Sequence, residues 1–156
     1  MAKITGVLPE RVFEFLRSGA PAVLVTVGAD GWGHAVMTWA RAIAPDRVRF
    51  GVDVGSTTQA NLERDGRATL QVIGKENILA LLKGHARLLR ERMVATPIIG
   101  MWDLSLTEVK DQRWAPVVVS PLVYEWTGPE AEKLRQMEQA VLAELRARGL
   151  LNRARR

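Results

Sequence analysis

Residues 50 to 66 read FGVDVGSTTQANLERDG, the end of a predicted strand followed by a hydroxyl-rich turn and a short helix. Gly55 permits backbone conformations that a side chain would forbid, and Ser56 or Thr57 can cap a helix that stops at Asp65-Gly66. The first turn of a helix carries free N–H groups and partial positive charge, so it attracts anions. Two interpretations stay open: the hydroxyls cap the helix, or they also hold a phosphate.

Strands are predicted on both sides of this turn, because apolar and β-branched residues alternate between glycine- and proline-containing turns. The turns at 28–31 and 44–47 are typical of hairpins, so the first three strands should pair antiparallel. We prefer a strand to a helix for residues 78–90, because Gly84 interrupts that segment. The expected strands are Ala22 to Val27, Trp32 to Ile43, Val48 to Val54, Arg67 to Ile73, Ile78 to Arg90, Trp102 to Thr107 and Val117 to Trp126.

Two of these expectations concern the last strands. Trp102, Leu104 and Leu106 alternate with Asp103, Ser105 and Thr107, the period-two pattern of a strand with one buried and one solvated face. Pro121 interrupts the final strand, so part of that strand should lie at an edge or bulge.

A helix is predicted near each end of the chain. The first opens at Leu8-Pro9-Glu10 and ends before Gly19, whereas the last follows Gly128-Pro129 and ends at Gly149. The last helix carries one apolar stripe, which would pack on its own domain or on a partner subunit, formed by Leu134, Met137, Val141 and Leu145. We therefore predict a mainly β fold, a six- or seven-stranded antiparallel split barrel over residues 1–149, with a basic tail at 150–156.

Composition narrows the class of protein. A hydrophobic fraction of 47% with 25% charged residues is typical of a globular domain. The chain has no cysteine, which excludes disulfides and thiolate chemistry, and with no signal-like segment we expect a cytoplasmic protein that does not enter a membrane. Three of the five net positive charges come from Arg153, Arg155 and Arg156, so nucleic acid is not the expected partner.

Few side chains suit acid–base or metal chemistry. His34 and His85 lie in predicted strands without a neighbouring carboxylate, and no Gly-x-Ser-x-Gly motif is present. No metal site is predicted, although a carboxylate magnesium site stays open. Arg41 would approach the hydroxyl turn if its strand pairs with the next one, and it would then face a phosphate; it could equally pair with Asp46 or Asp53.

Most of the chain, from Leu8 to about Trp126, resembles the pyridoxamine 5′-phosphate oxidase-like FMN-binding split-barrel family. The resemblance rests on the order and spacing of several short pieces rather than on one motif. They are Val23-Leu24-Val25-Thr26-Val27, Asp30-Gly31, Phe50, Gly55-Ser56, Asn61-Leu62, Asp65-Gly66-Arg67-Ala68 and Lys83-Gly84-His85-Ala86.

The resemblance implies a homodimer with FMN at the subunit interface and a flavin-dependent oxidoreductase acting on a small molecule that the sequence does not assign. By position, residues 37–41 would follow the flavin ring, Val52-Asp53 would lie near the ring or ribityl chain, and the three hydroxyls would meet the phosphate. The implied cofactor-binding residues are Met37, Thr38, Trp39, Arg41, Val52, Asp53, Ser56, Thr57, Thr58 and Asn61.

One departure from the family pattern matters for the phosphate. The oxidases usually place arginine and lysine after the serine, whereas this chain has neutral Thr57 and Thr58, so positive charge must come from Arg41, the helix N-terminus or a partner subunit. Vitamin B6 oxidation is therefore not the first choice. Two alternatives keep the barrel: a deazaflavin-dependent reductase, and a non-catalytic protein that binds flavin or haem.

Overall fold

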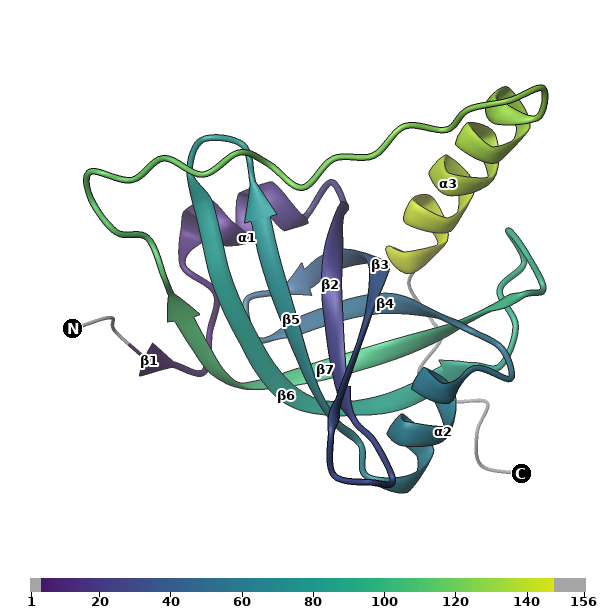
Figure 1. Ribbon diagram of the computed structural model, residues 1–156, viewed down its shortest axis with the longest axis horizontal. Coiled ribbons are helices and arrows are strands. Elements are labelled where there is room, and N and C mark those ends of the chain that lie inside the picture. The colour runs from purple at the N-terminus through teal and green to yellow at the C-terminus, as the bar shows by residue number, and fades with distance from the viewer. Residues whose placement is uncertain (1–3, 148–156) are drawn as a thin grey trace.

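Six strands close an antiparallel barrel in the computed structural model, which describes residues 4–147 (Figure 1). Around the barrel the order is β7-β4-β3-β2-β5-β6 and back to β7, while β1 pairs only with β7. The fold is therefore mainly β, as predicted. The strands are β1 (Ile4–Thr5), β2 (Ala20–Val27), β3 (Gly33–Ala44), β4 (Arg47–Asp53), β5 (Arg67–Gly74), β6 (Ile78–Arg90) and β7 (Ile99–Asp111), and the helices are α1 (Glu10–Leu16), α2 (Thr57–Arg64) and α3 (Ala131–Leu145).

The barrel interior follows the alternation of the sequence. Every second residue of β2 is buried, and the hairpin to β3 pairs Val27 with Gly33, as the turn composition predicted. Residues 78–90 form a strand rather than a helix. Side chains with no exposed surface fill the barrel, among them Leu24, Phe50, Leu70, Leu82 and Leu104.

The predicted strand from Val117 to Trp126 does not form. Residues 112–130 instead make an irregular connection, here called the strap, that crosses one end of the barrel and leads to α3 (Figure 1). Pro116 and Pro121 lack the N–H that a strand must donate, and Val118 and Val123 are exposed rather than packed. Isolated contacts hold the strap, such as the Leu122 N–H donating to Ile73 O at 3.0 Å.

Asp103 also differs from the prediction, because its carboxylate is fully buried instead of facing solvent. Strand register places Arg49 and Arg87 beside it, and Arg47 Nε donates to Asp103 Oδ2 at 3.1 Å. The end of α3 covers this face of the barrel, since Arg49 Nη1 donates to Leu145 O at 3.1 Å. Ser105 lies on the exposed side, as the alternation predicted.

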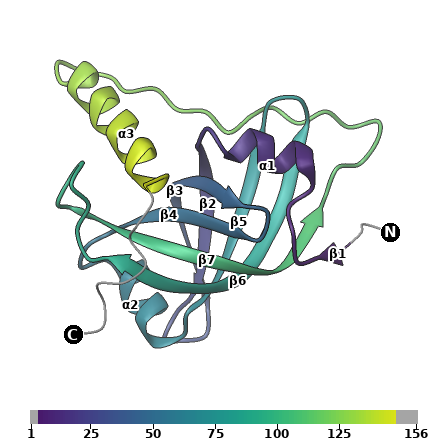
Figure 2. The same cartoon turned by 180° about the vertical axis from the view of Figure 1, so that it is seen from behind.

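Helix α3 packs on its own domain through the C-terminal half of the predicted stripe. Val141 and Leu145 are fully buried against Met93 and Met101, and Figure 2 shows the helix ending beside β3 and β4. The helix ends at Leu145, earlier than the predicted end at Gly149, and the basic tail at 150–156 lies outside the described residues. None of the helices within residues 4–147 has the length and apolar composition needed to span a membrane.

Candidate functional site

A cleft of about 520 Å³ opens where β3 and β4 meet the start of α2. Strand β3 contributes residues 34 and 36–39, β4 contributes 51–53, and α2 with its cap contributes 56–58. Ile99 of β7 and two strap residues, Tyr124 and Trp126, complete the lining. Cleft volumes in this range are common for small-molecule and cofactor sites.

The start of α2 forms one end of the cleft. Gly55 has a φ of +79°, and Ser56 is the N-cap, its Oγ accepting from the Gln59 N–H at 3.2 Å. The hydroxyl turn therefore caps a helix, as predicted. Within residues 4–147, the N–H groups of Thr57 and Thr58 have no hydrogen-bond acceptor, which leaves two donors at the positive end of the helix dipole.

Residues from both sides of β3 and β4 form the long wall. Thr38 Oγ1 donates to Gly51 O at 2.6 Å across the two strands, which holds this hydroxyl in the wall. A Cβ at Gly51 would lie 2.8 Å from Ile99 Cγ2, so glycine there leaves the floor of the cleft open. Met37, on the opposite side of β3 from Thr38, also lines the cleft, with about half of its surface exposed.

The cleft gathers all but two of the residues that the resemblance implied. Arg41 and Asn61 are the exceptions. The residues that do line the cleft are Met37, Thr38, Trp39, Val52, Asp53, Ser56, Thr57 and Thr58.

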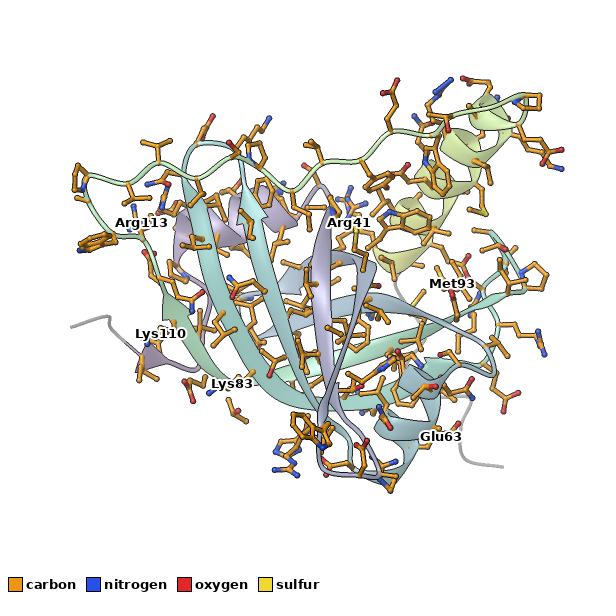
Figure 3. All side chains as sticks on the ribbon, in the orientation of Figure 1. Arg41, Glu63, Lys83, Met93, Lys110 and Arg113 are labelled. Carbon is orange, nitrogen blue, oxygen red and sulfur yellow. The ribbon has the colours of Figure 1, made fainter. Side chains whose placement is uncertain are left out.

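Arg41 points to α3 instead of to the hydroxyl turn (Figure 3). Its Nη1 donates to Leu142 O at 2.8 Å, and within the described chain it pairs with neither Asp46 nor Asp53. Burial is the main cause of a lowered pKa for this guanidinium. The cation that the sequence offered for a phosphate therefore docks the C-terminal turn of α3.

Asn61 of α2 is buried and does not line the cleft. Its Nδ2 donates to Thr26 Oγ1 at 3.0 Å, and its Oδ1 accepts from Arg64 Nη1 at 3.2 Å. The bond to Thr26 ties α2 to β2, and the bond from Arg64 lies within α2. Asn61 thus positions the helix that forms the end of the cleft.

Several lining residues were not predicted. Gly51 had a signal, because a glycine inside a strand indicates a close approach, and His34 and Val36 share the face of Thr38 by alternation. Nothing local marked the rest, which come from distant parts of the chain: Ile99, Tyr124 and Trp126.

Three aromatic side chains, Trp39, Tyr124 and Trp126, stand together on the strap side of the cleft, and we call them the aromatic wall. The ring centroids of Trp39 and Trp126 are 6.2 Å apart, and those of Tyr124 and Trp126 are 5.7 Å apart and edge to face. Glu138 of α3 lies behind them and accepts from the Tyr124 hydroxyl and, at 2.6 Å, from Trp126 Nε1. The Tyr124 hydroxyl also accepts from Trp39 Nε1.

The charge of the cleft is low. Among the described residues, its lining includes no lysine or arginine, and no group of three or more His, Cys, Asp or Glu side chains could hold a metal ion. Burial, reinforced by the hydrogen bond to Glu138, raises the pKa of Tyr124, so this phenol stays protonated well above neutral pH. The site therefore suits binding of a largely apolar molecule better than acid–base catalysis.

Several solved structures have a fold similar to that of this chain. An F420 reductase matches with a TM-score of 0.57 and 15% identity over 67% of this chain and 100% of that chain. HupZ of Group A Streptococcus matches with a TM-score of 0.56 and 12% identity over 72% and 99% of the two chains. A Clostridium acetobutylicum protein related to general stress protein 26, of the pyridoxinephosphate oxidase family, matches with a TM-score of 0.54 and 10% identity over 64% and 83%.

These matches define a class of fold. The chain is a split-barrel protein whose architecture is that of the pyridoxamine 5′-phosphate oxidase-like proteins, which is the family that the sequence resembles. No protein-family model matches the sequence, and no curated protein matches it. At these identities the likeness concerns architecture, so function has to be argued from the cleft.

Proposed function

We propose that the cleft binds FMN and that the protein is a flavin-dependent oxidoreductase acting on a small molecule. One observation carries this proposal: the fold brings the face of β3, the end of β4 and the capped start of α2 into one cleft. Such a cleft offers an apolar region that can hold a ring and a polar end that can hold a phosphate. A bound flavin supplies hydride or electron transfer itself, so the protein needs no acid–base pair of its own.

Three features make the polar end of the cleft suitable for an anion. The N–H groups of Thr57 and Thr58 lack protein acceptors, the hydroxyls of Ser56 and Thr57 stand beside them, and the helix dipole adds partial positive charge. Full neutralisation of a dianionic phosphate requires a cation as well. Because Arg41 is engaged with α3, that cation belongs to a partner subunit in this proposal.

The ring end would be held by the β3 wall. Met37 and Val52 offer apolar contact, Trp39 closes the side toward the strap, and Thr38 is kept in place by its bond to Gly51. These side chains orient a planar group and exclude water from it. Asp53 lies between the ring end and the phosphate end, where a ribityl chain has hydroxyls to donate.

A deazaflavin is the second candidate, and two observations favour it. An F420 reductase is among the structural neighbours, and the described lining has no lysine or arginine for a dianionic phosphate. The deazaflavin cofactor carries its phosphate as a diester with a single negative charge, which the helix start neutralises more completely than it would the FMN phosphate.

Absorbance and mass spectrometry of the purified protein test the proposal. FMN gives a visible band near about 450 nm and an FMN mass after denaturation, while a deazaflavin absorbs at shorter wavelength and a haem gives a Soret band. The expected result is one FMN per chain after incubation with excess FMN and removal of the unbound cofactor. A protein that retains no FMN, or whose FMN is not reduced by any nicotinamide donor, contradicts the oxidoreductase.

We also propose that the protein acts as a cytoplasmic homodimer with the cleft at the subunit interface. The outer faces of β2 and β3 beside the cleft are apolar, with Val23, Val25 and Met37 only partly covered. An apolar sheet face of this kind gains stability when a second subunit covers it.

A further inference from the structure

We propose that Glu138 is a positioning residue that fixes Trp39, Tyr124 and Trp126 as a stacking wall, and that this wall selects an uncharged, planar, conjugated ring. The inference rests on the proposed function in one respect only, since it concerns the same cleft. It assigns the ligand chemistry of the side of the cleft that faces the strap.

The first step of the argument is the hydrogen bonding of the three rings. Trp39 Nε1 donates to the Tyr124 hydroxyl, which donates to Glu138, and Trp126 Nε1 donates to the other oxygen of that carboxylate. Every polar atom of the aromatic wall is thereby satisfied within the cluster. The rings consequently meet the cleft as apolar surfaces, because their N–H and O–H groups are turned toward one another and toward α3.

The second step is the position of Glu138. The carboxylate reaches the strap from α3, and α3 is docked to the barrel by Arg41 at Leu142 O and by Arg49 at Leu145 O. Glu144 adds bonds from the N–H groups of Val94 and Ala95 at 2.8 and 2.7 Å. Glu138 therefore anchors Tyr124 and Trp126 of the irregular strap to a firmly held helix. Without this anchor the two aromatic side chains would be free to turn away from the cleft.

The third step is the charge of the lining. No lysine or arginine of residues 4–147 lines the cleft, and the strap side adds only aromatic surface to Met37 and Ile99. Aromatic faces stack on planar rings in offset geometry, and a saturated ring of the same size gains no such interaction. An uncharged conjugated ring is the chemistry that fits, whether it belongs to the cofactor or to the substrate.

The test compares wild type with Glu138→Gln, which keeps the size of the side chain but leaves one of its two donors without an acceptor. Glu132→Gln on the same helix is the matched control, because Glu132 is exposed and accepts only from the neighbouring Arg135 and Gln136. Trp126→Leu provides a second change in the wall itself. Thermal melting of each variant verifies that the barrel is intact.

Two probes distinguish the sources of the ring. Lumiflavin, the flavin ring without ribityl phosphate, is titrated into FMN-free protein, and 2-naphthol is titrated into FMN-loaded protein, with saturated 2-decalol as the non-planar comparison. We expect Glu138→Gln and Trp126→Leu to weaken at least one planar probe about tenfold, with Glu132→Gln and all 2-decalol values unchanged. A loss confined to lumiflavin assigns the wall to the cofactor ring, and a loss confined to 2-naphthol assigns it to the substrate.

The proposal is overturned if neither planar probe binds wild-type protein, or if both bind the folded Glu138→Gln and Trp126→Leu variants as tightly as wild type. Its failure is separate from that of the proposed function. If FMN binds but neither planar probe depends on Glu138 or Trp126, the proposed role of the aromatic wall is wrong and the flavoprotein assignment stands. If the protein does not bind FMN, 2-naphthol is tested on the protein as purified. Binding of a planar probe that depends on Glu138 would then support the aromatic wall and contradict the flavoprotein assignment.

Discussion

Ser56 and Thr57 supply the hydroxyls at the start of α2. Replacing them distinguishes a simple helix cap from a phosphate site. Replacing both, as Ser56→Ala with Thr57→Val, should weaken FMN about 10- to 100-fold, because a hydrogen bond to a charged group contributes about 1.5–3 kcal/mol. Loss of the Ser56 cap should also destabilise the protein by about 1 kcal/mol. Fluorescence titration of FMN measures the first effect.

The matched control for this change is Ser105→Ala, which removes an exposed hydroxyl from β7 at a position outside the cleft. It should leave FMN affinity unchanged. If the double variant binds FMN as tightly as wild type, the hydroxyls only cap α2.

Tyr124 provides a second prediction at the residue scale, since it is the only tyrosine of the chain. Burial and the hydrogen bond to Glu138 raise its pKa, so ultraviolet absorbance should show little tyrosinate in the folded protein at pH 10, where free tyrosine is about half ionised. The folded protein therefore holds the hydroxyl proton of Tyr124 more tightly than the unfolded chain does. The resulting contribution to stability is fully present below about pH 10 and declines as pH rises toward the folded pKa.

Glu138→Gln should bring the pKa of Tyr124 closer to the ordinary value, though not fully, because burial is the larger cause. Denatured protein provides the reference titration. A folded wild-type protein that titrates like free tyrosine would show that the hydroxyl is not held by Glu138.

Gly84 lies where strands β6 and β7 approach each other closely. It belongs to the Lys83-Gly84-His85-Ala86 segment that contributed to the family resemblance. A Cβ at Gly84 would lie 2.0 Å from Ser105 O, a backbone atom of β7, at the point where the register between the two strands shifts. Gly84→Ala should therefore destabilise the barrel by about 1–3 kcal/mol or more, because a backbone carbonyl cannot move aside cheaply.

Urea unfolding of Gly84→Ala measures this cost. Gly33→Ala in β3 is the control, since its Cβ would meet only Val25 Cγ1 at an ordinary 3.6 Å. Equal stability of Gly84→Ala and wild type would mean that β6 and β7 do not approach each other this closely.

Assembly is the prediction for the whole molecule. We expect a dimeric mass by light scattering at micromolar concentration and a shift to monomers in Val25→Lys, because this change places a charge in the apolar outer face of β2. FMN should be lost with the partner, since the described lining lacks the cation that a phosphate requires. Thr107→Lys, on an exposed position of β7, should remain dimeric; a wild-type monomer that retains FMN contradicts the dimer.

The sequence by itself determined the features that depend on near neighbours in the chain. Alternation over a few residues was enough for most strands, and Ser56 after Gly55 was enough for a helix start, because strand period and N-cap geometry are local. The mainly β split barrel follows from these elements and their short turns. Most of the candidate cofactor residues followed as well, since they lie on two adjacent strands and the helix between β4 and β5.

Only the tertiary structure decided which of several locally allowed states each remaining residue takes. Asp103 is buried among arginines of β4 and β6, and Arg41 binds α3 rather than the hydroxyl turn. Residues 117–126 form a strap because the barrel closes without them. The aromatic wall joins Trp39 to Tyr124, 85 residues away. Contacts over such separations depend on the packing of the whole chain, so no local pattern in the sequence can predict them.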